Sequence, residues 1–322
     1  MTKGRCFMKK RFLAILLTCT MIFGAGAFVP MNQADESFSL TASAEEGTHG
    51  NLTYYNNGEY IEITGCDDKS VEIVDIPAEI DGLPVKGIFV GAFSQFPNLT
   101  TVRIPDSVTE IWELAFYYCE KLNSVNIPDS VTSIGNRAFL GCKGLTDIVI
   151  GNGVTSIGDS AFQRCTNLES VTMGNSVTYI GLKAFAECRS LTSFVIPDGI
   201  THLEAVFPEC TRLKTVTIPE SVVFITRGAF YDCRNLMDVY YKGTEEQWDA
   251  IQIDDDEKNR NAPLLDANIH FDTPLEISVV NLIALNQSLK SSKSISLKYD
   301  MNGDNVVNVI DLALLKRALL NQ

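Results

Sequence analysis

The sequence predicts a mainly β protein, a solenoid of about seven 23-residue turns, with a small α-helical module at its C-terminal end. The first observation is a motif, L-x-x-V-x-I-P-x-S-V-T-x-I-G-x-x-A-F-x-x-C, that recurs through the middle of the chain. The second is a short run of Asp and Asn near the C-terminus with the spacing of a metal-binding loop. The phenylalanine of the repeat returns every 23 residues, with one step of 22 before Phe207, at Phe93, Phe116, Phe139, Phe162, Phe185, Phe207 and Phe230.

This period and spacing are typical of a leucine-rich-repeat solenoid. Repeats of about 20 to 29 residues with L-x-x-L-x-L spacing stack because one repeat cannot bury its apolar face alone. From residue 99 to 241, each repeat has a Leu-x-x-Val-x-Ile trio, which we expect on the inward face of a strand. A second apolar pair returns the chain, and the Ala-Phe pair is expected to close the turn as one irregular or helical turn.

The first 44 residues have the composition of a secretion signal. Five basic side chains lie within the first 11 residues, an apolar run follows from Phe12 to Phe23, and small-residue cleavage sites end at Ala27 and Ala44. A membrane anchor is the alternative, but the apolar run is shorter than the roughly 20 residues that a bilayer requires. We therefore expect cleavage and a secreted protein, extracellular or held at the cell surface through a scaffold.

The chain is acidic, and this disfavours two classes of partner. Its formal net charge is −14, and removal of residues 1–44 would take away five positive and two negative side chains, which gives −17. Binding to nucleic acids and anionic membranes depends on Lys and Arg, so neither is an expected partner. Neutral glycans are not disfavoured by this charge.

The segments on either side of the repeats are expected to cap the solenoid. Residues 45–98 contain short alternating runs separated by Asn56-Asn57-Gly58 and Asp81-Gly82, which predict hairpin strands. Residues 242–271 have apolar residues at irregular spacing and one last strand pattern. An open solenoid end exposes apolar surface and unpaired strand edges, which such segments would cover.

Six of the nine cysteines form a pattern of their own, because each lies three residues after a repeat phenylalanine. In an exported protein disulfides are the usual expectation. Stacked turns, however, lie about 4.8 Å apart with parallel side chains, whereas a disulfide needs Cβ atoms about 3.8 Å apart. We therefore predict a buried ladder of free thiols at Cys119, Cys142, Cys165, Cys188, Cys210 and Cys233.

Two surfaces are candidate binding sites on the solenoid. The outward strand positions are rich in hydroxyl residues, and they form either a binding face or an ordinary solvated β-surface. They are Thr101, Arg103, Ser124, Asn126, Asp147, Val149, Ser170, Thr172, Ser193, Val195, Thr215, Thr217, Asp238 and Tyr240. Nearer the outer edge, Trp112, Tyr117, Tyr118 and Tyr231 form either a contact patch or partly buried closure residues.

The repeat, with its Val-x-Ile-Pro strand and A-F-x-x-C ending, resembles the bacterial surface leucine-rich repeats called BspA-like. The resemblance covers roughly residues 52–271 and departs from the pattern at Leu203 to Phe207, where one residue and the usual Gly are missing. It implies an exported protein associated with adhesion and with binding to proteins or surfaces.

One motif near the C-terminus carries definite chemistry. Oxygen-bearing side chains at the first, third, fifth and twelfth places of a loop, with a backbone carbonyl at the seventh, wrap a hard cation in the manner of an EF-hand. The predicted ion is calcium, and Leu312 to Leu320 would form the following helix. The predicted ligands are Asp300, Asn302, Asp304, the Val306 carbonyl, Asp311 and a water held by Asn308.

This loop and helix resemble dockerin, the calcium-dependent module that attaches proteins to cohesin-bearing scaffoldins of cellulosomes. The resemblance covers about residues 272–322, but the upstream half has His270, Asp272 and Pro274 at ligand places and is expected to bind no ion. The resemblance implies that the cohesin-facing residues are Val309, Ile310, Lys316 and Arg317. The alternative is that these four belong to the exposed start and end of an ordinary helix.

The sequence favours a binding protein over an enzyme. Its three histidines, His49, His202 and His270, have no metal spacing or nucleophile motif around them. We therefore predict a secreted, non-catalytic binding or adhesion protein that recognises a protein or glycan through its solenoid and attaches to a cohesin-bearing cellulosome scaffold. The alternative is a cellulosomal polysaccharide-degrading enzyme of the glycoside hydrolase type, or an accessory factor.

Overall fold

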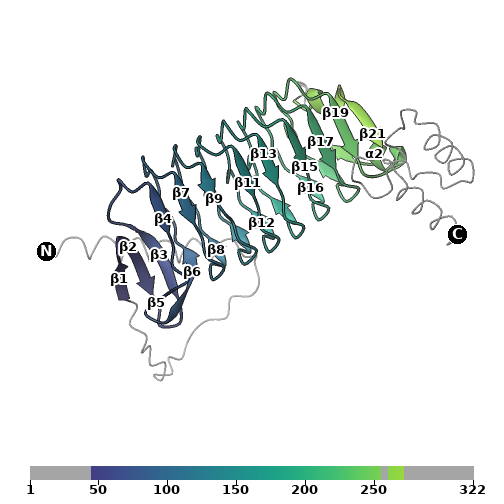
Figure 1. Ribbon diagram of the computed structural model, residues 1–322. Coiled ribbons are helices and arrows are strands. Elements are labelled where there is room, and N and C mark those ends of the chain that lie inside the picture. The colour runs from purple at the N-terminus through teal and green to yellow at the C-terminus, as the bar shows by residue number, and fades with distance from the viewer. Residues whose placement is uncertain (1–44, 255–259, 272–322) are drawn as a thin grey trace, which may run out of the picture. The chain divides into compact units, whose positions relative to one another are not determined.

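Figure 1 shows the computed structural model, which describes residues 45–254 and 260–271. In this part of the chain each turn of a β-solenoid contributes one short strand to each of two faces and an irregular segment to a third side. The mainly β leucine-rich-repeat solenoid predicted from the 23-residue period is confirmed. Among the described residues no helix is long and apolar enough to cross a membrane.

The first face is built from the Leu-x-x-Val-x-Ile segments. Its strands are parallel, and residues 23 apart in sequence, such as Val102 and Val125, are paired across neighbouring strands. The strands are β4 (Ile73–Asp75), β7 (Thr101–Arg103), β9 (Ser124–Val125), β11 (Asp147–Val149), β13 (Ser170–Thr172), β15 (Ser193–Val195), β17 (Thr215–Ile218), β19 (Asp238–Tyr241) and β21 (Asn268–Phe271). They form three hydrogen-bonded groups, β4-β7-β9, β11-β13 and β15-β17-β19-β21.

The second face carries the returning apolar pair of each repeat. Ile111, Ile134 and Ile157 point inward and are buried, and their strands pair in parallel. The strands are β6 (Leu83–Ile88), β8 (Glu110–Ile111), β10 (Ser133–Ile134), β12 (Ser156–Ile157), β14 (Tyr179–Ile180), β16 (His202–Leu203), β18 (Phe224–Ile225) and β20 (Gln252–Ile253).

At the N-terminal end three longer strands continue the second face. β1 (Glu45–His49), β2 (Leu52–Asn56) and β3 (Ile61–Cys66) pair antiparallel, and β3 then pairs in parallel with β6. A short strand β5 (Glu79–Ile80) adds to β6. The antiparallel strands agree with the alternating patterns and turn residues of this region.

The third side, called the turn side below, is irregular rather than helical within the described turns. In each described turn except the shortened one, two residues four apart adopt left-handed backbone conformations. As far as Glu209, their N–H groups donate to carbonyls of the next turn, as from Leu114 to Asn136 at 3.0 Å. The first left-handed position holds Gly91, Leu114, Arg137, Ser160, Lys183 and Gly228. The second holds Gln95, Tyr118, Gly141, Arg164, Glu187, Glu209 and Asp232.

The core consists of two ladders that run from turn to turn. The rings from Phe93 to Phe185 stack with centroids 5.0–5.4 Å apart. The six repeat cysteines are free and buried, and each thiol donates to the carbonyl of the phenylalanine one turn back, at 2.9–3.3 Å. The predicted ladder of free thiols is therefore confirmed. From Phe116 onward the same carbonyl also accepts the backbone N–H of the cysteine three residues later, so the thiol from the next turn is its second donor.

The last turn ends in a different structure. Helix α2 (Glu245–Asp249) begins at a capping box made by Thr244 and Gln247, and α3 (Ala262–Leu265) places Leu264 in the core. The buried Asn261 accepts a hydrogen bond from the Phe230 N–H at 3.3 Å, where in the preceding turns a backbone carbonyl of the next turn accepts, in all but one turn that of an alanine. Its side chain therefore closes the backbone ladder of the turn side.

Candidate functional site

The predicted calcium ligands and the predicted cohesin-facing residues lie outside the described residues. The first set is Asp300, Asn302, Asp304, Val306, Asn308 and Asp311, and the second is Val309, Ile310, Lys316 and Arg317. Among the residues that the structure describes, no group of three or more His, Cys, Asp or Glu is placed to hold a metal ion. The surfaces of the solenoid are therefore the sites that geometry can describe.

On the first face the predicted outward positions do point away from the core, and none of them is buried. Some of these outward residues join neighbouring turns to each other. The amide of Asn126 exchanges two hydrogen bonds with the backbone of Ile104, at 3.0 and 3.1 Å, where β9 is too short to pair. Arg103 forms an ion pair with Asp75 on the neighbouring strand. The N-terminal part of this face is thus occupied by contacts between turns.

At the C-terminal end the same face gathers a cluster that sequence reasoning did not find. His270 stacks on Tyr240 at 4.8 Å, and its Nε2 lies 2.7 Å from a carboxylate oxygen of Asp238. Hydrogen bonds from His270 and Asn268 hold the pKa of Asp238 below its usual range. The available signal was the strand register, because Asn268 and His270 in NIHF take the places of Asp238 and Tyr240 in DVYY.

On the turn side the four aromatic residues separate into different roles. Trp112 packs at 6.3 Å from Phe89 and is partly buried, and Tyr231 is 48% exposed and far along the stack. Tyr117 and Tyr118 contact each other edge to face, with centroids 4.6 Å apart, and line one groove. The contact-patch interpretation therefore fits this pair, and the closure interpretation fits Trp112.

Tyr118 is laid along the turn side rather than pointing out from it. A Cβ atom placed on Gly141, one turn further on, would lie 3.0–3.2 Å from three atoms of the Tyr118 ring, so the ring covers this glycine. The Tyr118 hydroxyl accepts a hydrogen bond from Arg164 at 3.2 Å, two turns away. Glycine at 141 thus serves two needs, its left-handed φ of 75° and the space for the ring.

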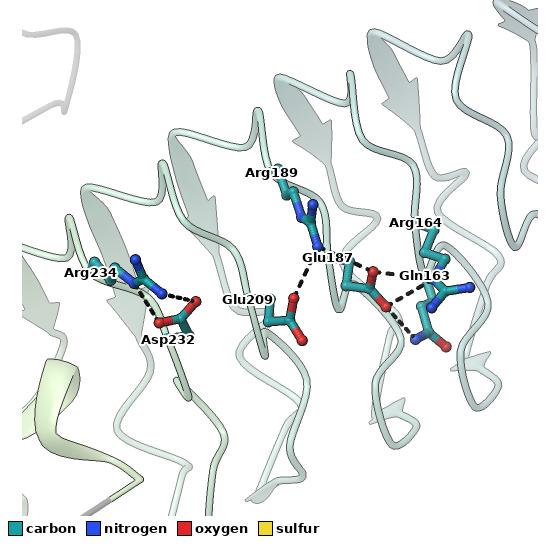
Figure 2. A network of polar contacts seen from close by, with 7 residues as sticks. All are labelled: Gln163, Arg164, Glu187, Arg189, Glu209, Asp232 and Arg234. Atoms are coloured by element: carbon teal, nitrogen blue, oxygen red, sulfur yellow. Dashed lines mark hydrogen bonds and ion pairs between the residues drawn. The ribbon is translucent and has the colours of Figure 1, made fainter.

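Figure 2 shows the ionic network that holds Arg164. The Glu187 side chain is only 16% exposed, and Arg164 Nε donates to both oxygens of its carboxylate, at 3.0 and 3.1 Å. Gln163 donates to the same carboxylate at 3.1 Å, and Arg189 bridges it to Glu209. The network fixes the guanidinium that contacts Tyr118, because a planar fork bound at several points has few other orientations.

A solved structure of another protein shares this fold. A leucine-rich repeat protein from Bacteroides ovatus is 25% identical, with a TM-score of 0.52 over 65% of this chain and 67% of that chain. A leucine-rich repeat protein of T. pallidum is 27% identical, with a TM-score of 0.44 over 61% of this chain and 81% of that chain. The comparison with curated proteins gave no match.

Two families match the sequence itself. The family described as dockerin type I domain matches residues 279–320. The family described as BspA type leucine rich repeat region matches residues 86–207 and 204–249, in six copies, which together are just over half of the chain. Neither description is that of an enzyme. The chain therefore belongs to the BspA type leucine-rich repeat family and carries a type I dockerin domain at its C-terminal end.

Proposed function

We propose that this protein is a secreted, non-catalytic binding protein that a dockerin attaches to a cohesin-bearing scaffold of the cellulosome type. In this proposal the solenoid recognises a protein or glycan, and the scaffold brings that ligand close to polysaccharide-degrading enzymes. The observation that carries the proposal is the joining of a continuous leucine-rich-repeat solenoid to a dockerin in one chain.

The chemistry of the loop fits calcium. Asp300, Asp304 and Asp311 supply carboxylate oxygens, Asn302 an amide oxygen and Val306 a carbonyl, which are the hard donors that calcium prefers. Asn308 would hold a water at the ninth place. Asp311 stands at the twelfth place, where the usual EF-hand loop has the longer Glu.

Calcium and cohesin binding are coupled in this proposal. A helix of about nine residues is marginal in water by itself, so Leu312 to Leu320 depends on the loop for its first turn. Binding energy that exists only in the folded form becomes folding energy. Val309, Ile310, Lys316 and Arg317 would therefore present a cohesin-binding surface only when the loop holds its ion.

The test is calorimetry of the full chain with calcium, followed by capture on an immobilised cohesin with and without chelator. We expect one calcium site and cohesin capture that a chelator abolishes. Asp300→Ala and Asp311→Ala should remove both, whereas the control Asp272→Ala, in the degenerate upstream half, should change neither. Two calcium sites, or capture that survives the chelator, would contradict the proposal.

Catalysis is tested separately. The purified protein should release no reducing sugar from plant polysaccharides over hours of incubation. Release of reducing sugar that persists after removal of contaminating hydrolases would replace the binding function with an enzymatic one.

A further inference from the structure

We propose that the groove beside Tyr117 and Tyr118 on the turn side binds a neutral pyranosyl glycan chain, with the Tyr118 ring as the stacking platform. This inference rests on the proposed function only in taking the solenoid to be a ligand-binding domain, and it is independent of the dockerin. It places the ligand on the turn side rather than on the broad hydroxyl-rich face.

The Tyr118 ring is covered on one side by the next turn, and it lines the groove. The Tyr118 ring lies over Gly141, and the Tyr117 ring contacts it with centroids 4.6 Å apart and the two ring planes 66° apart. Two aromatic rings at this angle suit a sugar ring that stacks on Tyr118 and contacts Tyr117 from the side. The C–H bonds on one side of a pyranose carry slight positive charge, which matches the negative face of an aromatic ring.

The platform is fixed before any ligand arrives. Arg164 donates to the Tyr118 hydroxyl at 3.2 Å, and Glu187 holds Arg164 through both of its oxygens (Figure 2). Glu187 is itself held by Gln163 and Arg189. A side chain already held in its binding position loses less entropy on association, so this network favours binding.

The groove is open to solvent, and its lining is partly apolar and partly polar. Its volume is about 450 Å³, and Gln95, Pro97, Glu120 and Lys121 complete its lining. Sites for small ligands combine apolar surface with a few polar groups that fix orientation. An amide, a carboxylate and an ammonium group at the rim can exchange hydrogen bonds with sugar hydroxyls.

The charges of the groove favour a neutral ligand. Glu120 forms an ion pair with Lys143, and Lys121 donates to Asn98, so the rim is close to balanced. The whole chain carries a formal charge of −14, which repels a polyanionic glycan. An uncharged sugar chain escapes this repulsion.

The test uses the full chain in calcium buffer and measures binding of cellohexaose, xylohexaose, mannohexaose and the anionic hexagalacturonate by calorimetry. We expect at least one neutral hexasaccharide to bind and hexagalacturonate not to bind. Tyr118→Ala should weaken binding by about tenfold. Tyr118→Phe keeps the ring but loses the bond to Arg164, and it should weaken binding by about two- to fivefold.

Tyr231→Ala is the matched control, because Tyr231 occupies the same place in its turn as Tyr117 but lies outside the groove. It should bind as the unaltered protein does, and circular dichroism should show that all variants are folded. Failure of all three neutral glycans, an unchanged affinity in Tyr118→Ala, an equal loss in Tyr231→Ala, or preference for hexagalacturonate would each overturn the inference. If the unaltered protein binds a protein but no glycan, and Tyr118→Ala loses that binding, the inference is overturned in favour of protein recognition.

Cohesin capture, measured on the same samples, separates this inference from the proposed function. If the glycans fail and capture persists with calcium, the groove assignment falls and the scaffold attachment stands. If capture fails and a neutral glycan binds through Tyr118, the scaffold attachment falls and the groove assignment stands.

Discussion

The regular turns of the solenoid and its one shortened turn solve the same packing problem in different ways. From Phe93 to Phe185 the rings stack face to face at nearly constant spacing, whereas Phe207 lies 6.4 Å from Phe185. Phe194, which stands where most other repeats have Val or Ile, contacts both rings at 5.0 and 4.8 Å. A ring from the first face thus fills the space that the altered turn leaves.

The hydrogen bonds show which residue the short turn lacks. In a regular turn the carbonyls that accept from Leu114 and Phe116 belong to Asn136 and Ala138, two residues apart. The corresponding acceptors for Lys183 and Phe185 are Ala205 and Val206, which are adjacent. The missing residue is therefore the first left-handed one, and its N–H bond to the next turn is missing with it.

The thiol ladder passes through this place without change. Cys210 donates to the Phe185 carbonyl at 3.1 Å, within the range of the regular turns. The comparison teaches that the turn side absorbs a deletion while the strands and the buried thiols keep their positions. The following predictions test this difference.

The largest effect is expected for Phe139→Ala, in the middle of the regular stack. Phe139 is fully buried between two rings at 5.0 and 5.1 Å, so its loss removes two stacking contacts and leaves a cavity. We expect the free energy of unfolding to fall by about 3 to 5 kcal/mol, measured by urea denaturation. The exposed Tyr231→Ala should change it by less than about 1 kcal/mol. If Phe139→Ala lowers the free energy of unfolding by less than about 1 kcal/mol, the stack does not stabilise the solenoid.

A smaller loss is expected for Phe194→Val, which gives the short turn a residue that regular turns carry at this place. Because Phe194 fills the gap between Phe185 and Phe207, we expect a loss of about 1 to 3 kcal/mol. Insertion of one Gly between Ala205 and Val206 restores the 23-residue period and should make Val tolerable at position 194. If the insertion does not improve the Val variant, the gap has another cause.

The thiol ladder predicts a dependence on alkaline pH. Burial raises the pKa of Cys165 to about 12, whereas the pKa of a thiol in the unfolded chain is about 8.5. Between these values the unfolded chain has lost the proton that the folded chain keeps, so stability falls as pH rises, by up to about 1.4 kcal/mol per pH unit per thiol. Cys165→Ala should make this slope shallower, measured by urea denaturation from pH 8 to 10 under reducing conditions.

Cys210→Ala should reduce the slope by the same amount, because the ladder is continuous through the short turn. Burial also places the pKa of Cys210 well above its usual range. Unequal changes would show that the deletion does disturb the thiols. Fast modification of the ladder thiols in the native protein by a thiol reagent would contradict the ladder itself.

The smallest effect is a gain from Ser160→Gly. Ser160 has a φ of 55°, a left-handed conformation that costs a residue other than glycine roughly 1 to 2 kcal/mol. Glycine loses more entropy on folding, so the net gain should be about 0.5 to 1 kcal/mol. Gly91 and Gly228 already occupy the same place in their turns. A loss of thermal stability in this variant would show that the Ser160 side chain makes an unrecognised contribution.

The sequence by itself determined the repeat, its inward residues and the free thiols. These features depend on a side-chain pattern that returns every 23 residues, and stacking brings equivalent positions of neighbouring turns together whatever the details of the turns. The free thiols could be predicted from the spacing between turns, because that spacing is too wide for a disulfide.

Only the tertiary structure decided the turn side and the surfaces built on it. Leu114, Arg137 and Tyr118 carry no sequence signal for left-handed backbone, since it is the hydrogen bonds to the next turn that hold them there. The bond from Arg164 to Tyr118 spans two turns. His270 meets Asp238 across an insertion that breaks the 23-residue period. Such contacts depend on how side chains lie between turns, and the repeat pattern fixes only which positions become neighbours.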